Sequence, residues 1–92
     1  MEKILTLHPQ GKNGVNIDKV KYEHVKKTII CSLSGEPLTL TELFTSIEKN
    51  IAPTFEGKIG WYSHAVKQDL EARKLIERTS DKPQKYKLVE AI

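Results

Sequence analysis

Cysteine is almost absent from the sequence: Cys31 is the only one among 92 residues. A single thiol excludes a disulfide within the chain and fits a reducing compartment. No apolar run approaches the ~20 residues that a membrane-spanning helix needs. The first ten residues also lack the apolar middle and the small-residue cleavage site of a signal peptide. We therefore expect a cytoplasmic protein with no membrane partner.

Groupings of residues that support catalysis or metal binding are also missing. His8, His24 and His64 lie far apart and have no histidine or cysteine partner at metal-ligand spacing. The segment Gly11–Gly14 lacks both the length and the following Lys-Ser/Thr pair of a phosphate-binding loop. No nucleophile, base and orienting group can be assigned together. We therefore expect no enzymatic activity, no metal, no cofactor and no small-molecule ligand.

The composition is that of one small globular domain. Hydrophobic residues make up 38% of the chain and charged residues 29%, which is too apolar for a disordered protein. A chain of 92 residues has no room for a second core. The net charge of +3 permits a nucleic-acid partner without indicating one, because many proteins with no such partner are as basic.

A first helix is predicted from Asp18 to about Leu33. Asp18 is a good N-cap, and apolar side chains recur at helical spacing from Tyr22 onwards. The other side of this helix is rich in lysine, which is typical of a solvent-exposed face. Gly35 follows directly and is the expected C-cap.

A short strand at 38–40 and a second helix at about 41–50 are predicted next. Thr39 and Glu42 have the S/T-x-x-E spacing of a capping box. The apolar stripe of this helix consists of Leu40, Leu43, Phe44, Ile47 and Ile51. A proline-containing link follows, longer than the three or four residues of a tight helix-turn-helix. We expect Phe55 to pack into the core from this link.

The stretch from 57 to 89 predicts a long helix, 59–74, followed by two strands within 75–89. The apolar stripe of this helix consists of Ile59, Tyr62, Val66, Leu70 and the stem of Arg73. The opposite face, which we expect to be exposed, carries Trp61, His64, Lys67, Gln68 and Glu71. The period changes to alternation at Leu75, and the polar residues 80–84 predict a turn.

This order of elements resembles the recognition helix and wing of a winged helix-turn-helix domain. The phrase DLEARKLIERT, residues 69–79, is similar to the signature that ends that helix and begins the wing. Lys74 stands where the family usually has glycine, so this helix must close without the residue that becomes left-handed most easily. The resemblance implies an α+β, mostly helical fold for residues 18–92, in the order helix, strand, helix, helix, strand, strand. The whole chain is also similar to a family of short bacterial proteins with no assigned activity.

Residues 1–17 form an N-terminal extended arm that the bare winged fold does not need. Ile4, Leu5 and Leu7 favour a short strand. An apolar arm of this kind packs on its own domain or on a second copy of it, which would make a homodimer. Disorder of the arm is the alternative.

The resemblance implies that helix 59–74 and the wing, 75–89, bind duplex DNA, as in a small transcriptional regulator. Exposed helix residues would approach base edges, and basic groups would neutralise phosphates. We expect His64 and Gln68 at the bases. The full set of candidate DNA-binding residues is Trp61, His64, Lys67, Gln68, Arg78, Lys82 and Lys85.

The alternative function is a protein–protein interaction or dimerisation module that does not bind DNA. The exposed helix face has no arginine, although arginine to guanine is the commonest specific contact. Trp61 either covers the core, which is the preferred interpretation, or stays exposed as a binding surface. The position of the charges separates the two functions. Cations gathered on one surface favour DNA, whereas an arm that covers helix 59–74 favours a protein partner.

Overall fold

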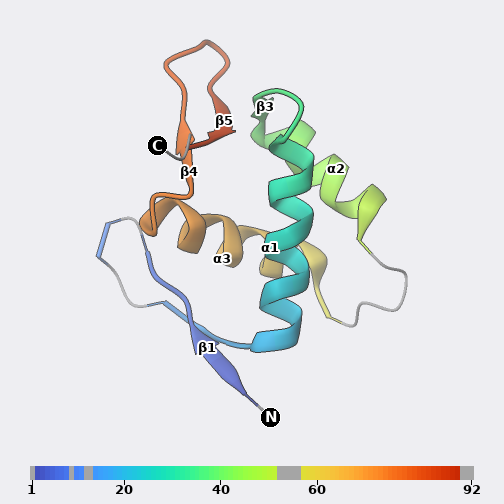
Figure 1. The fold of residues 1–92 in the computed structure, drawn as a ribbon, viewed down its shortest axis with the longest axis vertical. Helices are drawn as coiled ribbons and strands as arrows, with labels where there is room; N and C mark the ends of the chain where they lie inside the picture. The colour runs from blue at the N-terminus through green and yellow to red at the C-terminus, as the bar shows by residue number, and fades with distance from the viewer. Residues whose placement is uncertain (1, 9, 12–13, 52–56, 90–92) are drawn as a thin grey trace.

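The computed structural model describes residues 2–8, 10–11, 14–51 and 57–89. This part of the chain forms three helices and two small antiparallel sheets (Figure 1), which confirms the predicted α+β class. None of the described helices is long and apolar enough to cross a membrane. Phe55, expected to pack into the core, lies outside the described residues. The elements are β1 (Lys3–Leu5), β2 (Asn16–Asp18), α1 (Lys19–Leu33), β3 (Leu38–Thr39), α2 (Leu40–Asn50), α3 (Ile59–Ala72), β4 (Ile76–Arg78) and β5 (Lys85–Leu88).

Helix α1 begins where the sequence predicts. The Asp18 carboxylate accepts a hydrogen bond from the Val20 backbone N–H at 3.0 Å, which satisfies one of the free donors of the first turn. The prediction of Gly35 as the C-cap is wrong. The cap is Ser34, which keeps a right-handed conformation and donates its N–H to the Cys31 carbonyl, so the helix closes without a left-handed residue.

The predicted capping box at the start of α2 is confirmed. The Glu42 N–H donates to the Thr39 hydroxyl at 3.2 Å, and the Thr39 N–H donates to the Glu42 carboxylate at 2.9 Å. Two otherwise free donors are satisfied reciprocally. Because Thr39 also ends β3, the strand passes into the helix without a connecting loop.

The three-stranded sheet has the order β3–β5–β4. Tyr86 of β5 pairs with Leu38 of β3 on one side and with Arg78 of β4 on the other. The strand–turn–strand pattern predicted for the end of the chain is therefore confirmed. The short strand β3, which precedes α2, pairs with β5 although the two strands are more than forty residues apart in the sequence.

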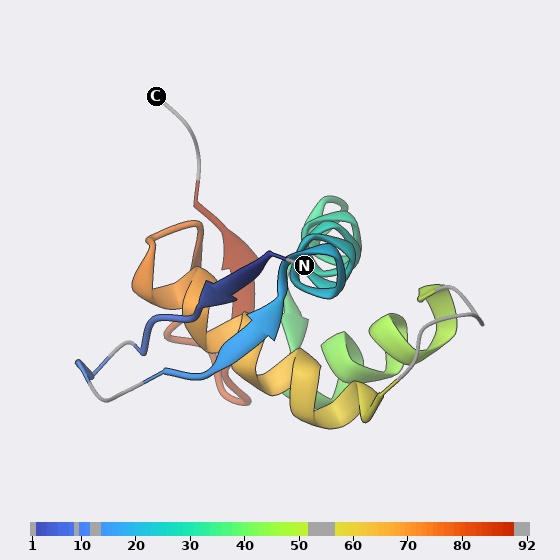
Figure 2. The same cartoon turned by 90° about the horizontal axis from the view of Figure 1, so that it is seen from below.

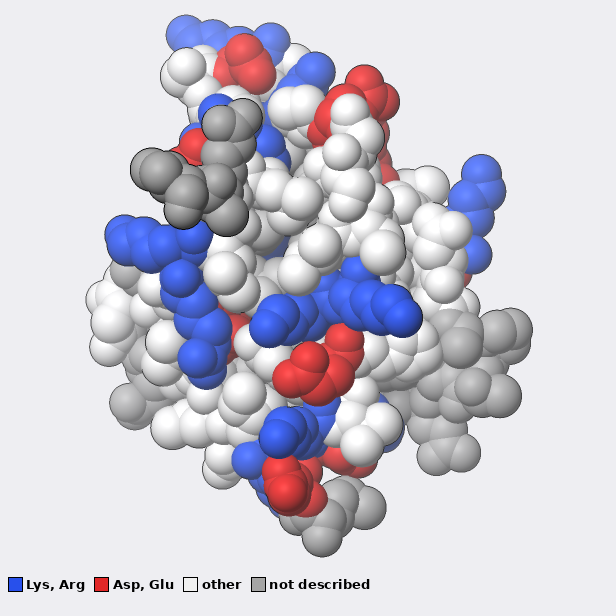
Figure 3. All heavy atoms as spheres, in the orientation of Figure 1, with Lys and Arg blue, Asp and Glu red and all other residues white. Residues whose placement is uncertain are grey.

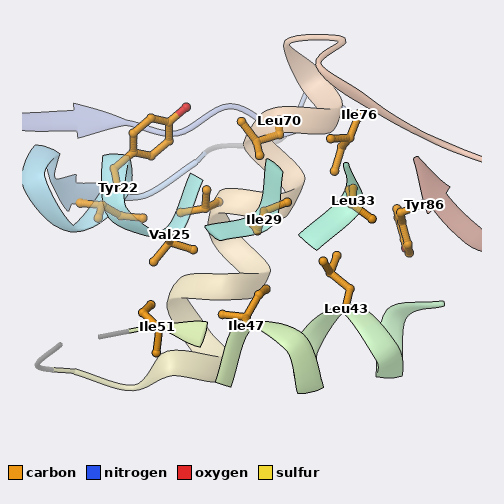
Figure 4. Close-up of a cluster of buried hydrophobic side chains, with 12 residues drawn as sticks. Tyr22, Val25, Ile29, Leu33, Leu43, Ile47, Ile51, Leu70, Ile76 and Tyr86 are labelled. Carbon is orange, nitrogen blue, oxygen red and sulfur yellow. The ribbon is translucent and has the colours of Figure 1, made fainter. Parts of the chain in front are cut away.

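The core lies where the three helices meet, with Ile76 of β4 and Tyr86 of β5 at its edge (Figure 4). Helices α1 and α2 contribute half of its buried side chains, and Val66 and Leu70 enter it from α3. Each aliphatic side chain that is fully buried stabilises the fold by roughly 1.5–3 kcal/mol. The buried apolar residues are Ile17, Tyr22, Val25, Ile29, Leu33, Leu43, Ile47, Ile51, Val66, Leu70, Ile76 and Tyr86.

The N-terminal arm packs on the domain as a hairpin, here called the N-terminal hairpin (β1, β2 and the described residues between them). Ile4 pairs with Ile17, and the Thr6 N–H donates to the Val15 carbonyl at 2.9 Å. Ile17 is part of the main core. The predicted order of elements lacks the strand pair β1–β2 and is wrong in that respect. Figure 2 shows the hairpin beside α1 and α3, on the side away from α2.

Helix α3 ends through a left-handed residue that is not glycine. Lys74 has φ of 65°, the conformation for which glycine is favoured. The Leu75 N–H donates to the Leu70 carbonyl and the Lys74 N–H to the Glu71 carbonyl, at 2.9 and 3.1 Å. This is the Schellman arrangement of a helix C-terminus. The helix thus ends at Ala72, two residues earlier than predicted.

Candidate interaction surface

The outward face of α3, here called the strip, has the β4–β5 hairpin on one side and the N-terminal hairpin on the other. The β4–β5 hairpin lies along one side of the helix, where its Arg78 contacts Glu71. The N-terminal hairpin lies along the other side, where the Leu7 N–H donates to Asp69 at 2.8 Å. Figures 1 and 2 show these two hairpins on different sides of α3. The predicted site residues that remain accessible on the strip are Trp61 and His64, which are exposed, and Gln68, which is half-buried.

The expectation that Lys67 is exposed is wrong. Its residue is only 2% exposed, and its ammonium lies 3.5 Å from Glu71 and 4.8 Å from the centre of the Tyr86 ring. A carboxylate and an aromatic face compensate the loss of hydration that burial causes. Lys67 is therefore placed to support the β4–β5 hairpin, and a phosphate cannot reach it there.

The other predicted cations do not gather on the strip. The Arg78 guanidinium donates to Glu71 at 2.9 Å, and this hydrogen bond raises its pKa. Lys85 lies on the central strand β5, where it pairs with Thr39 of β3 and exchanges hydrogen bonds with Thr79 after β4, and it is half-buried. Lys82 is exposed in the turn. On the face that carries α1, basic and acidic side chains are interleaved (Figure 3).

Trp61 does not cover the core, so the preferred interpretation of this residue is wrong and the alternative, an exposed tryptophan, is observed. It is 47% exposed, and its ring meets the Tyr62 ring edge to face at a centroid distance of 4.9 Å. Tyr62 is the half-buried member of the pair and packs against the core. An exposed tryptophan fixed by a neighbouring ring is a rigid apolar contact surface.

A cavity of about 120 Å³ lies between the N-terminal hairpin and α3. Leu7 and Val15 from the hairpin and Trp61 from the helix are its exposed apolar members, and we call these three residues the apolar patch. Burial lowers the pKa of His64, and the nearby charges of Lys67 and His8 act in the same direction. The cavity is lined by Thr6, Leu7, His8, Gly14, Val15, Trp61, His64, Ala65 and Gln68.

Asp69 joins the N-terminal hairpin, α1 and α3, and it is not among the predicted site residues. It is fully buried and accepts hydrogen bonds from the Leu7 N–H, the Tyr22 hydroxyl and the Arg73 guanidinium. Burial and the bond to Asp69 raise the pKa of the Tyr22 hydroxyl. The only sequence signal for this site is the spacing of Asp69 and Arg73, one helical turn apart.

Comparison with known protein families agrees with the expected similarity to a family with no assigned activity. A family model described as "Family of unknown function (DUF6958)" matches residues 3–86. The chain belongs to this family. The match includes the N-terminal hairpin as well as the three helices, so the hairpin is part of the family's common unit. No curated protein and no solved structure matches the chain.

Proposed function

We propose that the protein is a winged-helix module that forms a homodimer through the apolar patch of Leu7, Val15 and Trp61. The order of α1, β3, α2, α3, β4 and β5 supports a winged helix, as does the pairing of β3 with the last strand. In this assignment α3 is the recognition helix and the β4–β5 hairpin is the wing. The N-terminal hairpin is an addition that covers one side of α3.

The observation that carries this proposal is the concentration of exposed apolar side chains at one place. Among the described residues, four of the eight exposed large hydrophobic side chains lie on the N-terminal hairpin or beside it: Leu5, Leu7, Val15 and Trp61. Contiguous exposed apolar surface of this kind marks an interface on a small domain. Its one aromatic member, Trp61, is of a residue type that often dominates binding energy at interfaces.

A second copy of the chain fits this surface because the patch is self-complementary. In a two-fold dimer, residues near the axis meet their own copies, so a charged surface would repel itself and an apolar surface would not. Leu7, Val15, Trp61 and Gln68 carry no charge, and the lowered pKa of His64 keeps that side chain neutral at pH 7. The lysine expected on this face, Lys67, is buried under the wing.

Removal of the Trp61 side chain tests the proposal. We expect Trp61→Ala to weaken the dimer by at least about 30-fold, because an aromatic anchor at an interface contributes roughly 2 kcal/mol or more. Val20→Ala is the matched control, since Val20 is more exposed than Trp61 and lies on α1, outside the patch. Sedimentation equilibrium over a range of concentrations measures both. A monomer at every concentration, or equal effects of the two variants, rules out this interface.

Duplex DNA is the second candidate partner, and the exposed cations of the wing favour it. Lys82 is exposed and Arg78 is half-exposed, so both remain accessible to phosphates. Fluorescence anisotropy of a labelled mixed-sequence duplex, at low and at physiological salt, separates the candidates. Binding that falls steeply with salt and loses one unit of salt slope in Lys82→Ala supports DNA. The homodimer account predicts no such binding.

A further inference from the structure

An open groove of about 940 Å³ runs between α1 and α2. It is separate from the apolar patch, which lies on α3 and the N-terminal hairpin. Figure 2 shows α2, which forms one wall of the groove, on the side of the molecule away from that hairpin. The volume and length of the groove suit a segment of chain, because the eight steps along α1 from His24 to Ser32 span about 12 Å, or just over two helical turns.

The floor of the groove is made of small hydroxyl side chains that already have partners. Ser32 donates to the Thr28 carbonyl and lies 2.8 Å from the Ser46 hydroxyl. Thr28 donates to the His24 carbonyl, and Asn50 donates to Ser46. A segment that covers Thr28, Ser32 and Ser46 therefore leaves none of their three hydroxyls without a partner. Small side chains also let the backbone of a second helix come close.

The two ends of the groove carry opposite charge. Lys27 of α1 and Lys49 of α2 lie at one end, and no residue in the described ranges forms an ion pair with either of them. Glu36 and Glu42 lie at the other end, beyond the C-terminus of α1 and in the first turn of α2. The contact between Ser32 and Ser46 marks the middle. A charge distribution of this kind selects both the partner and its direction.

We infer that this groove binds an α-helix of a partner protein, with the acidic N-terminal turn of that helix at Lys27 and Lys49. Its basic C-terminal turn then lies at Glu36 and Glu42. Acidic residues in the first turn and basic residues in the last turn are the arrangement that the helix dipole favours. The bound helix runs antiparallel to α2, because α2 begins at the acidic end of the groove and ends at the basic end.

Two designed peptides of about fifteen residues test the inference with the full chain. Both are alanine-based helices with serine on one face, and chains of that length are just long enough to be helical alone. The forward peptide has glutamate in its first turn and lysine in its last, and the reversed peptide has these charges exchanged. We expect the forward peptide to bind at least about tenfold more tightly than the reversed one by fluorescence anisotropy.

Charge reversal in the protein provides the specific control. Lys27→Glu with Lys49→Glu should abolish or invert the preference for the forward peptide. Lys3→Glu with Lys82→Glu makes the same change in net charge away from the groove and should leave the preference unchanged.

Cys31 supplies a second readout, because it is exposed on the wall of the groove and is the only thiol in the chain. Alkylation of Cys31 should slow at least about fivefold when the forward peptide saturates the protein, since the covered thiol is then accessible only in the free state. Absence of binding by both peptides overturns the inference. Equal binding of the two peptides, or an unchanged alkylation rate at saturation, overturns it as well.

Discussion

At the scale of single residues, two buried charges hold the hairpins in place beside α3. Asp69 connects the N-terminal hairpin, α1 and α3 through three hydrogen bonds. Lys67 lies between Glu71 and the ring of Tyr86, below the β4–β5 hairpin. Charged side chains are almost never fully buried unless they are paired, and the sequence predicts Lys67 on the exposed face of this helix. The burial of Asp69 and Lys67 fixes which part of α3 remains available to a partner.

Loss of the Asp69 carboxylate should be the most damaging change of a single charge. Asp69→Ala leaves the Leu7 N–H, the Tyr22 hydroxyl and the Arg73 guanidinium without their acceptor. We expect it to lower the free energy of unfolding by roughly 3–5 kcal/mol. Glu77→Ala is the control, because its ion pair with Lys87 is half-exposed and should contribute at most about 1 kcal/mol. Urea denaturation of both variants measures the difference, and similar losses would show that Asp69 is not a structural link.

Replacement of Lys74 by glycine should stabilise the folded protein. Its left-handed backbone costs an L-residue roughly 1 kcal/mol that glycine does not incur, so Lys74→Gly should raise the free energy of unfolding by about that amount. Lys74→Ala removes the same charge and keeps a Cβ, so it should bring no such gain. Thermal and urea unfolding compare the pair. A gain shared equally by both variants would assign the effect to charge and not to the backbone.

His64 should make stability depend on pH in one direction. Its pKa is lowered in the folded protein, by burial first and then by Lys67 and His8, while Glu71 acts in the opposite sense. The unfolded chain therefore binds the proton at a higher pH than the folded chain does. The stabilisation is complete above the unfolded pKa of about 6.5, and it decreases as pH falls from there towards the lower folded pKa.

A glutamine at position 64 isolates this contribution. His64→Gln should show a smaller loss of unfolding free energy than the wild type between about pH 7 and pH 5. Urea denaturation at a series of pH values gives both profiles. Parallel profiles would mean that other groups produce the pH dependence.

At the scale of elements, the N-terminal hairpin depends on a close approach at Gly14. A Cβ at this position would lie 1.7 Å from the Thr6 carbonyl oxygen, which is backbone and cannot move aside without opening the hairpin. The Thr6 hydroxyl also accepts the Val15 N–H at 2.9 Å in the same turn of chain. The hairpin, and with it the Leu7 contact to Asp69, should therefore require glycine here.

Alanine at Gly14 should loosen this hairpin specifically. We expect Gly14→Ala to lower the free energy of unfolding by roughly 1–3 kcal/mol and to increase hydrogen exchange at the Leu7 amide. Gly35→Ala is the matched control, because that glycine has open space around it and no positive φ. Protection of the Leu7 amide that is unchanged in Gly14→Ala would contradict the proposed role of this contact.

The elements that the sequence predicts well are those whose signals are local. Asp18 caps α1 by a hydrogen bond to Val20, and Thr39 and Glu42 cap α2 by hydrogen bonds to each other. The partners are at most three residues apart, so the sequence alone indicates where both helices begin. The strand pair β1–β2 cannot, because Ile17 enters a shared core and Leu7 bonds to a residue 62 positions away. The sequence predicts an exposed Lys67 for a related reason, although the residue is buried. A helical wheel shows which residues face away from the apolar stripe, but not that a later hairpin covers some of them.

At the scale of the whole molecule, α3 is enclosed on three sides. The core takes Val66 and Leu70, the β4–β5 hairpin covers Lys67 and Glu71, and the N-terminal hairpin covers the side of Asp69. The part left open carries Trp61 and is flanked by Leu7 and Val15. A major groove about 12 Å wide accepts a single helix, and a helix with a hairpin alongside it is wider than that. This geometry is the reason to place a second copy of the chain on α3 before a duplex.

Isotope-filtered NMR on a mixture of labelled and unlabelled chains tests the homodimer most directly. It records only those proton contacts that join two different copies, so contacts within one chain do not interfere. The account predicts contacts between copies from the Trp61 indole to the methyl groups of Leu7 and Val15, and their loss on dilution. A mixed sample in which no contact between copies involves Trp61, at concentrations high enough for NMR, would contradict it.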